Sequence, residues 1–91
     1  MKVRVKFFAY FREVFGGREK AVNLAQGATV LDLLNALADS TRVRGELFEK
    51  EQLKPHLVLM KNETKMHSLK GLGTALEDGD VIAIFPLMGG G

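Results

Sequence analysis

The last residues of the chain are the part whose residue types most directly suggest chemistry. An apolar run, Val81 to Phe85, is followed by Pro86, Leu87, Met88 and three glycines, Gly89, Gly90 and Gly91. Valine, isoleucine and phenylalanine favour a β-strand, whereas glycine lacks a Cβ atom and leaves the backbone free. Glycines can pass through a narrow slot in another protein, so the reactive group would be the α-carboxylate of Gly91. The alternative is an inert chain end, because termini commonly have no role.

The other candidates for catalysis or metal binding are weaker. The chain has no cysteine, which excludes disulfides, thiolate nucleophiles and thiolate metal ligands, so any sulfur that it handles comes from elsewhere. His56 and His67 lack a metal-binding spacing, which favours a packing or surface role. Gly71 and Gly73 lack the further glycine and the lysine of a phosphate loop. The sequence therefore predicts no metal site, no bound cofactor and no enzyme active site of its own.

Length and charge limit the class of protein. Ninety-one residues, of which 46% are hydrophobic, predict a single domain over residues 1–91, with residues 86–91 as an exposed tail. The formal net charge of +2 is mild and the basic residues are scattered, so nucleic acid is not an expected partner. No apolar run reaches the length of a membrane span or resembles a signal peptide. We therefore expect a soluble, cytoplasmic protein without a membrane partner.

The first third of the chain predicts a hairpin with a short helical turn inside it. Residues 2–10 alternate in polarity, which places Val3, Val5, Phe7 and Ala9 toward a core and leaves Phe8 on the charged face. Residues 11–15 are expected to form a short helical turn or a loop that closes at Gly16 and Gly17. Residues 18–24 alternate again, with Leu24 and either Ala21 or Val22 inward, and are expected to pair antiparallel with the first strand.

The principal helix is predicted to begin after Thr29, whose hydroxyl can cap it, with Asp32 in its first turn. Its apolar stripe consists of Val30, Leu33, Leu34, Leu37 and Ala38. Residues 40–55 have no clear pattern, although residues 46–49 suggest a short helix or hairpin arm. Pro55 precedes an expected strand over residues 56–62, which is followed by a turn and a short edge strand over residues 65–69.

Two strands, a helix, and further strands ending in an apolar one fit an α+β fold of the β-grasp type. We expect a mixed sheet of four to five strands, with the helix across it and the first and last strands parallel at its centre. In the last strand we place Ile82 and Ile84 inward, and Val81, Ala83 and Phe85 outward, although an apolar run leaves the opposite register open. Phe8 and Phe85 would then form an aromatic patch beside the tail, unless a loop covers them.

Three segments carry a resemblance to a known family. The end of the chain, residues 85–91 after the turn of residues 76–80, resembles the end of the small subunit of molybdopterin synthase, a MoaD-type ubiquitin-like sulfur carrier. Residues 5–13 and 56–62 are similar to the first and middle strands of this family and of the archaeal ubiquitin-like modifiers. Leu87 stands where a second proline is usual, and Gly89 where a small or polar residue is common.

The resemblance implies a carrier function. An E1-like adenylating enzyme would use ATP to activate the carboxylate of Gly91, and a sulfur donor would convert it to a thiocarboxylate. The large subunit of molybdopterin synthase would then receive the tail, with Phe8, Phe85, Pro86, Leu87 and Met88 contacting the partner and Gly89 to Gly91 entering its active site. The activated carboxylate could instead join a target lysine, as in a ubiquitin-like modifier. A thiamine-pathway sulfur carrier and a plain interaction module are further alternatives.

Overall fold

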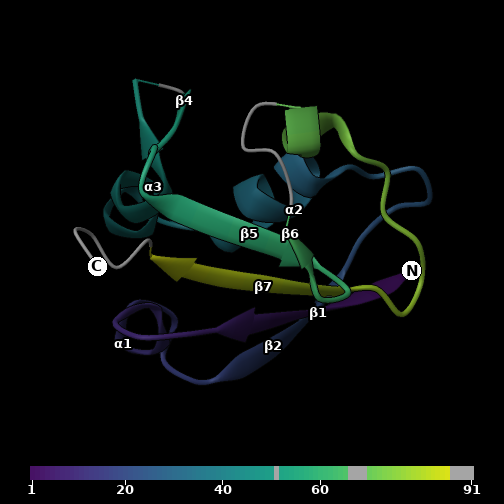
Figure 1. The fold of residues 1–91 in the computed structure, drawn as a ribbon, viewed down its shortest axis with the longest axis horizontal. Helices are drawn as coiled ribbons and strands as arrows, with labels where there is room; N and C mark the ends of the chain where they lie inside the picture. Colours follow the sequence, from purple (N-terminus) through teal and green to yellow (C-terminus); the bar gives the residue numbers. More distant parts are fainter. Residues whose placement is uncertain (51, 66–69, 87–91) are drawn as a thin grey trace.

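The computed structural model describes residues 1–50, 52–65 and 70–86 as a sheet with helices on one side (Figure 1). In chain order the elements are β1 (Lys2–Phe7), α1 (Phe11–Phe15), β2 (Glu19–Asn23), α2 (Val30–Leu37), α3 (Thr41–Leu47), β3 (Phe48–Glu49), β4 (Gln52–Leu53), β5 (Leu57–Lys61), β6 (Thr64–Lys65), η1 (Lys70–Gly73) and β7 (Val81–Pro86). None of the described helices is long and apolar enough to cross a bilayer.

The main sheet has five strands in the order β2-β1-β7-β5-β6. β1 and β7 are parallel and lie side by side, whereas β2, β5 and β6 pair antiparallel with their neighbours (Figure 1). β3 and β4 form a separate two-stranded hairpin. The expected β-grasp architecture, with the first and last strands parallel at the centre, is therefore confirmed.

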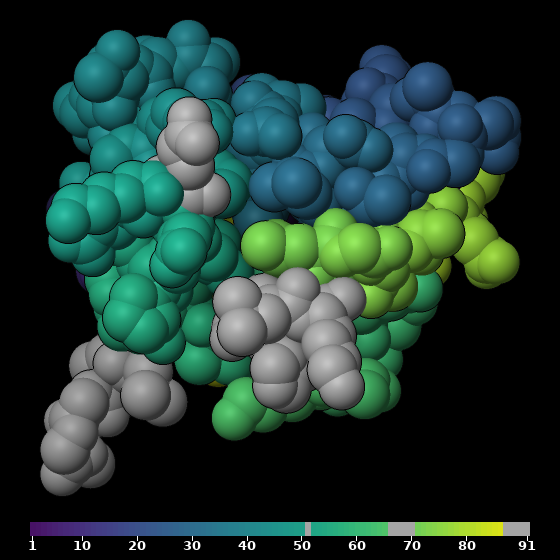
Figure 2. Space-filling view, turned by 90° about the horizontal axis from the view of Figure 1, so that it is seen from above, coloured from purple at the N-terminus to yellow at the C-terminus, as the bar shows by residue number. Residues whose placement is uncertain are grey.

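The core lies between the sheet and α2. Thr29 caps this helix as expected: its hydroxyl accepts a hydrogen bond from the Asp32 backbone N–H, and the Asp32 carboxylate accepts one from the Thr29 N–H at 2.8 Å. The predicted apolar stripe of α2 is buried at Val30, Leu33, Leu34 and Leu37. Seen from above, α2, α3 and the segment of residues 70–80 lie at the surface, and little of β1 or β7 is visible (Figure 2).

The buried side chains of the two central strands, β1 and β7, all lie on the face that the helices cover. Val3, Val5 and Phe7 of β1 are buried, and so are Ile82 and Ile84 of β7, which confirms the predicted register of the last strand. Parallel pairing places Val5 opposite Ile82 and Phe7 opposite Ile84. These pairs give each central strand one fully apolar face under the helices.

One inward assignment in the first strand was wrong. β1 ends at Phe7, and Ala9 is exposed with a left-handed φ of 55°, because the chain turns there into α1. The α1 helix itself follows the prediction and ends at Gly16, whose φ of 74° suits a residue without a Cβ atom. In β2, Val22 is half-buried and Ala21 is exposed, so Val22 is the residue that points inward, and Leu24, just after the strand, is also half-buried.

The middle of the chain contains a helix that the sequence pattern did not reveal. Ser40 caps α3 by accepting a hydrogen bond from the Val43 N–H at 3.2 Å, and Leu47 at its end is buried. Residues 46–49 were expected to form either a short helix or a hairpin arm, and they contain part of each: α3 ends at Leu47 and β3 begins at Phe48. β6 occupies Thr64–Lys65, which overlaps the expected edge strand only at Lys65, while residues 66–69 lie outside the described part.

We predict that Leu34→Ala lowers the free energy of unfolding by roughly 2–5 kcal/mol, because it removes a fully buried side chain and leaves a cavity. Leu31→Ala is the matched control, since Leu31 lies on the same helix but is 38% exposed, and it should change stability by less than about 0.5 kcal/mol. Urea denaturation followed by circular dichroism measures both. Equal losses would show that α2 does not bury the predicted face.

Candidate functional site

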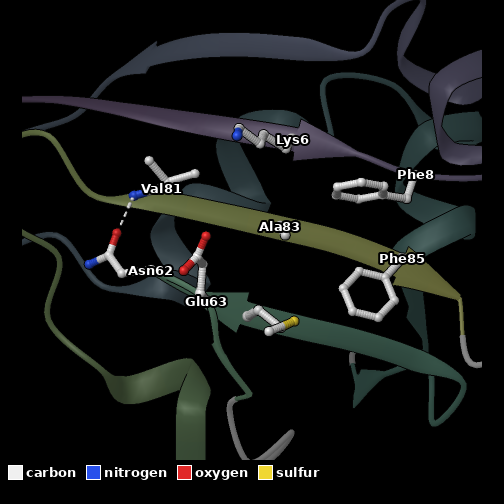
Figure 3. Close-up of a pocket in the computed structure, with 8 residues that line it drawn as sticks. Lys6, Phe8, Asn62, Glu63, Val81, Ala83 and Phe85 are labelled. Atoms are coloured by element: carbon white, nitrogen blue, oxygen red, sulfur yellow. Dashed lines mark hydrogen bonds between the residues drawn. The ribbon is translucent and has the colours of Figure 1, made fainter.

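The face of the sheet opposite the helices carries an unusual number of apolar side chains. Val81, Ala83 and Phe85 alternate with the buried isoleucines of β7 and are half-buried on this outer face. Met60 of β5 and Phe8, just after β1, lie beside them (Figure 3). Phe8 is 37% exposed, so a large aromatic ring faces solvent next to a row of apolar groups. The predicted aromatic patch therefore exists, and among the described residues no loop buries Phe8.

Phe8 and Phe85 form an edge-to-face pair. Their ring centroids are 5.7 Å apart and the ring planes meet at 83°. Such a pair contributes about 0.5–1.5 kcal/mol beyond the area that it buries. The backbone keeps the rings together, because the Phe8 N–H donates to the Ile84 carbonyl at 3.1 Å as the β1–β7 pairing ends.

Arg12, in addition to Phe85, contacts the Phe8 ring. Its guanidinium carbon lies 5.6 Å from the centroid of the Phe8 ring, within the range of a cation–π contact. Its Nε–H also donates to the Phe7 carbonyl at 3.0 Å, which fixes the arginine to the end of β1. The sequence pattern did not single out Arg12, although its position in the first turn after the strand places it near Phe8.

Two hollows meet at the aromatic pair. The larger, of about 450 Å³, runs along β7 and is lined by Lys6, Phe8, Met60, Asn62, Glu63, Val81, Ala83 and Phe85. The smaller, of about 310 Å³, is lined by Phe8, Ala9, Phe85 and Pro86. Apolar hollows around exposed rings can receive side chains of another protein. In the described part of the chain, no three His, Cys, Asp or Glu residues are grouped so that they could hold a metal ion.

Pro86 corrects the expected start of the exposed tail. It is the last residue of β7, lies opposite Leu57 of β5 and is buried, so it belongs to the sheet. A proline without a backbone donor suits the end of a strand. Its side chain still lines the smaller hollow, which keeps it beside the candidate site. Leu87, Met88, Gly89, Gly90 and Gly91, the remaining predicted site residues, lie outside the described residues.

A polar contact between Tyr10 and His56 lies near the C-terminal end of β7. The Tyr10 hydroxyl and His56 Nε2 are 3.3 Å apart, and His56 precedes Leu57, the partner of Pro86. Partial burial, together with the nearby carboxylate of Glu46, raises the pKa of Tyr10. His56 is half-buried in this contact, while His67 lies outside the described residues.

A buried carboxylate fixes the other end of β7. Asp80 is only 7% exposed and accepts hydrogen bonds from Asn62 Nδ2 at 3.0 Å and from the Glu77 N–H at 2.8 Å, with Lys61 Nζ 3.6 Å away. Burial alone would raise the pKa of Asp80, but these hydrogen bonds and the lysine charge outweigh it and lower the pKa.

The same asparagine also binds the first residue of β7. Asn62 Oδ1 accepts from the Val81 N–H at 2.9 Å, and the Asn62 N–H donates to the Val81 carbonyl at 2.8 Å (Figure 3). Asn62 has a left-handed φ of 48°, which asparagine tolerates better than most residues. The turn after β5 thus holds β7 in register where its outer face begins.

Comparison with known proteins identifies relatives over the whole chain. The model of the ThiS family matches residues 5–91. Small archaeal modifier protein 3 of Haloferax volcanii is 39% identical over 92 residues, which cover 100% of both chains. The crystal structure of SAMP1 from the same organism is 31% identical, covers 100% of both chains and has a TM-score of 0.84.

Two other solved structures bear different names. A Pyrococcus furiosus protein provisionally named molybdopterin converting factor, subunit 1, is 30% identical, with a TM-score of 0.76 and coverage of 94% of this chain and 97% of that one. A chain of the BexX/CysO complex from Amycolatopsis orientalis is 29% identical, with a TM-score of 0.75 and coverage of 98% and 99%. One similar protein therefore has a structure within a complex.

We predict that the free energy of unfolding of Asp80→Asn depends less on pH in the acid range than that of the wild type. The folded-state pKa of Asp80 lies below its unfolded value of about 3.9, so its ionised form stabilises the fold above that pH, and this contribution is lost as the pH falls through the folded-state pKa. The variant should lose roughly 1–3 kcal/mol at pH 7 and less below pH 4. Denaturation from pH 7 to pH 2 tests this, with the exposed Asp39→Asn as control. A wild-type curve as flat as that of Asp80→Asn would contradict it.

Proposed function

Because the chain belongs to the ThiS family of ubiquitin-like sulfur carriers and modifiers, we propose that it carries sulfur as a thiocarboxylate on Gly91. Proteins of this family are carriers or modifiers and have no catalytic activity of their own, so the chain is not an enzyme by itself. In the proposed reaction it supplies a carboxyl group and a surface by which other proteins recognise it.

The observation that carries the proposal is the position of the aromatic pair at the end of β7. Phe85 lies one residue before Pro86, where β7 ends, and its ring contacts Phe8 on the outer face. A partner that covers these rings would lie beside Pro86, the residue from which the chain continues toward Gly91. Docking would offset the entropy lost when the tail is ordered, about 1–2 kcal/mol per residue, and would raise the effective concentration of the carboxylate.

Activation of the carboxylate requires an adenylating partner. A carboxylate is a poor electrophile, so the partner, an E1-like enzyme, binds ATP and lets a Gly91 oxygen attack the α-phosphate, with pyrophosphate leaving. Hydrosulfide from a sulfur donor then attacks the acyl carbon of the adenylate, the bond from that carbon to the AMP oxygen breaks, and loss of the S–H proton leaves the thiocarboxylate. ATP is thus bound by the partner, and this chain binds no cofactor.

The proposed acceptor of the sulfur is the pterin precursor of molybdenum cofactor. The large subunit of molybdopterin synthase would hold that substrate and receive the tail, as the resemblance of the chain's end and the name of the Pyrococcus furiosus relative suggest. Both reactions would take place in the cytoplasm.

The second candidate function is protein modification. The names of the Haloferax volcanii relatives favour it, since both are called small archaeal modifier proteins. A lysine amine of a target would attack the same acyl-adenylate, AMP would leave, and an isopeptide bond to Gly91 would form. Because the two functions share the activated intermediate, they differ only in the nucleophile that follows. A thiamine-pathway carrier has no such support, because the Phe-Pro segment is not typical of those shorter chains.

We predict that protein purified from its native host contains a fraction whose intact mass has increased by the replacement of one oxygen with sulfur. Deletion of Gly90 and Gly91 should abolish this fraction and pterin maturation together. Peptides in which Gly91 is joined to a lysine would support modification instead. If neither product is found, and the deletion leaves pterin maturation unchanged, the carrier proposal fails.

We also predict that Phe8→Ala lowers kcat/KM for adenylation by the host's E1-like enzyme at least about tenfold, because a central aromatic anchor commonly contributes 2 kcal/mol or more to docking. The variant should stay folded, although its melting temperature should fall by about 4–8 °C for each kcal/mol lost with the Phe85 and Arg12 contacts. Leu31→Ala removes a similarly exposed side chain from the helical side and should leave kcat/KM unchanged. Equal kcat/KM for both variants would exclude the outer face as the docking site.

A further inference from the structure

A basic recess adjoins the aromatic pair on the side away from β7. This hollow of about 320 Å³ is lined by four cations and one carboxylate, together with Phe7 and Phe8; the charged residues are Arg4, Lys6, Arg12, Arg18 and Glu19. Glu19 forms an ion pair with Arg4. Among the described residues no carboxylate forms an ion pair with the other three cations, so the recess has a local positive charge. The formal net charge of the whole chain, +2, does not indicate this local excess.

The recess is continuous with the apolar surface. Phe8 lines the recess and both hollows beside Phe85, and Lys6 lines the recess and the larger of those hollows. The Arg12 guanidinium lies over the Phe8 ring, so positive charge and aromatic surface are in direct contact. An occupant of the recess therefore lies within reach of the aromatic pair as well.

The exposure of these cations favours a protein carboxylate over a small free anion. Arg4, Lys6, Arg12 and Arg18 are all exposed, so water screens them and a lone anion gains little from them. A carboxylate on a protein surface that also covers Phe8 and Phe85 is brought close by the apolar contact, and its charge adds to recognition.

On the basis of the proposed function, we infer that the adenylating partner places an aspartate or glutamate in this recess while an apolar side chain beside it covers the Phe8–Phe85 pair. Attraction to the cations steers the first encounter and sets the orientation in which the tail meets the partner's active site. The recess therefore acts mainly on the association rate and makes it dependent on ionic strength.

The test is the double variant Lys6→Glu/Arg18→Glu. Arg12 is left unchanged because it also binds the Phe7 carbonyl, and Arg4 because it pairs with Glu19. Lys20→Glu is the control: it lies on β2 between Glu19 and Ala21 and opposite Val5, whose side chain points to the core, so it reverses a charge on the other face. Because the control is a single change, Lys6→Glu alone is measured beside it.

The association rate with the host's purified E1-like enzyme and ATP is measured by stopped flow in salt on the order of 0.05 M and 0.5 M. At low salt the double variant should associate at least about tenfold more slowly than wild type, Lys6→Glu should be intermediate, and Lys20→Glu should differ by less than about twofold. The difference should shrink at high salt. Circular dichroism confirms that every variant folds.

Each other outcome overturns the inference. If wild type is adenylated and the double variant associates as fast as Lys20→Glu, the recess has no such role while the carrier function stands. If wild type is neither bound nor adenylated, the proposed function fails and the inference fails with it. If a single-stranded oligonucleotide binds wild type at 0.5 M salt and loses affinity in the double variant, the recess is a nucleic-acid site.

Discussion

The parallel pairing of β1 with β7 is the constraint on which the rest of the structure depends. It places Phe7 opposite Ile84 and lets the Phe8 N–H reach the Ile84 carbonyl, so that Phe8 and Phe85 emerge together on the outer face. Because side chains alternate along a strand, a slip of one residue would turn the apolar set of β7 from the core to solvent. The register that builds the core therefore also brings Phe8 and Phe85 together on the outer face.

The two ends of β7 are fixed by different interactions. At its start, the exposed Asn62 side chain and the buried Asp80 side chain accept hydrogen bonds from backbone N–H groups and bond to each other. At its end the contacts are mainly aromatic and apolar, and Pro86 terminates the strand inside the sheet. The rigid start sets the register, while the apolar end lies where a partner would meet the chain. This arrangement suits a domain that presents a short segment to other proteins.

The sequence predicted the central strands, α2 and the outer position of Phe85, because hydrophobic periodicity and helix caps are local signals. The register of β7 could be proposed but not decided from an entirely apolar run, and burial under α2 decides it. The Asn62–Asp80 hydrogen bond joins residues 18 positions apart, and the Tyr10–His56 contact joins residues 46 positions apart. A local sequence pattern therefore cannot predict either contact. The helix α3 had a capping serine and spaced apolar residues, but Gly45 and its polar neighbours obscured them.

In the proposed function, other proteins recognise the chain by the outer face of the sheet, and the helical face supports that sheet. The most direct measurement is an NMR titration of the ¹⁵N-labelled protein with the host's E1-like enzyme and ATP. The account predicts that the amide signals of Lys6, Phe8, Ala83 and Phe85 shift or broaden first, while those of α2 remain unchanged. Changes concentrated on Leu31, Asp32 and Asn35 of α2, with the outer face unaffected, would contradict it.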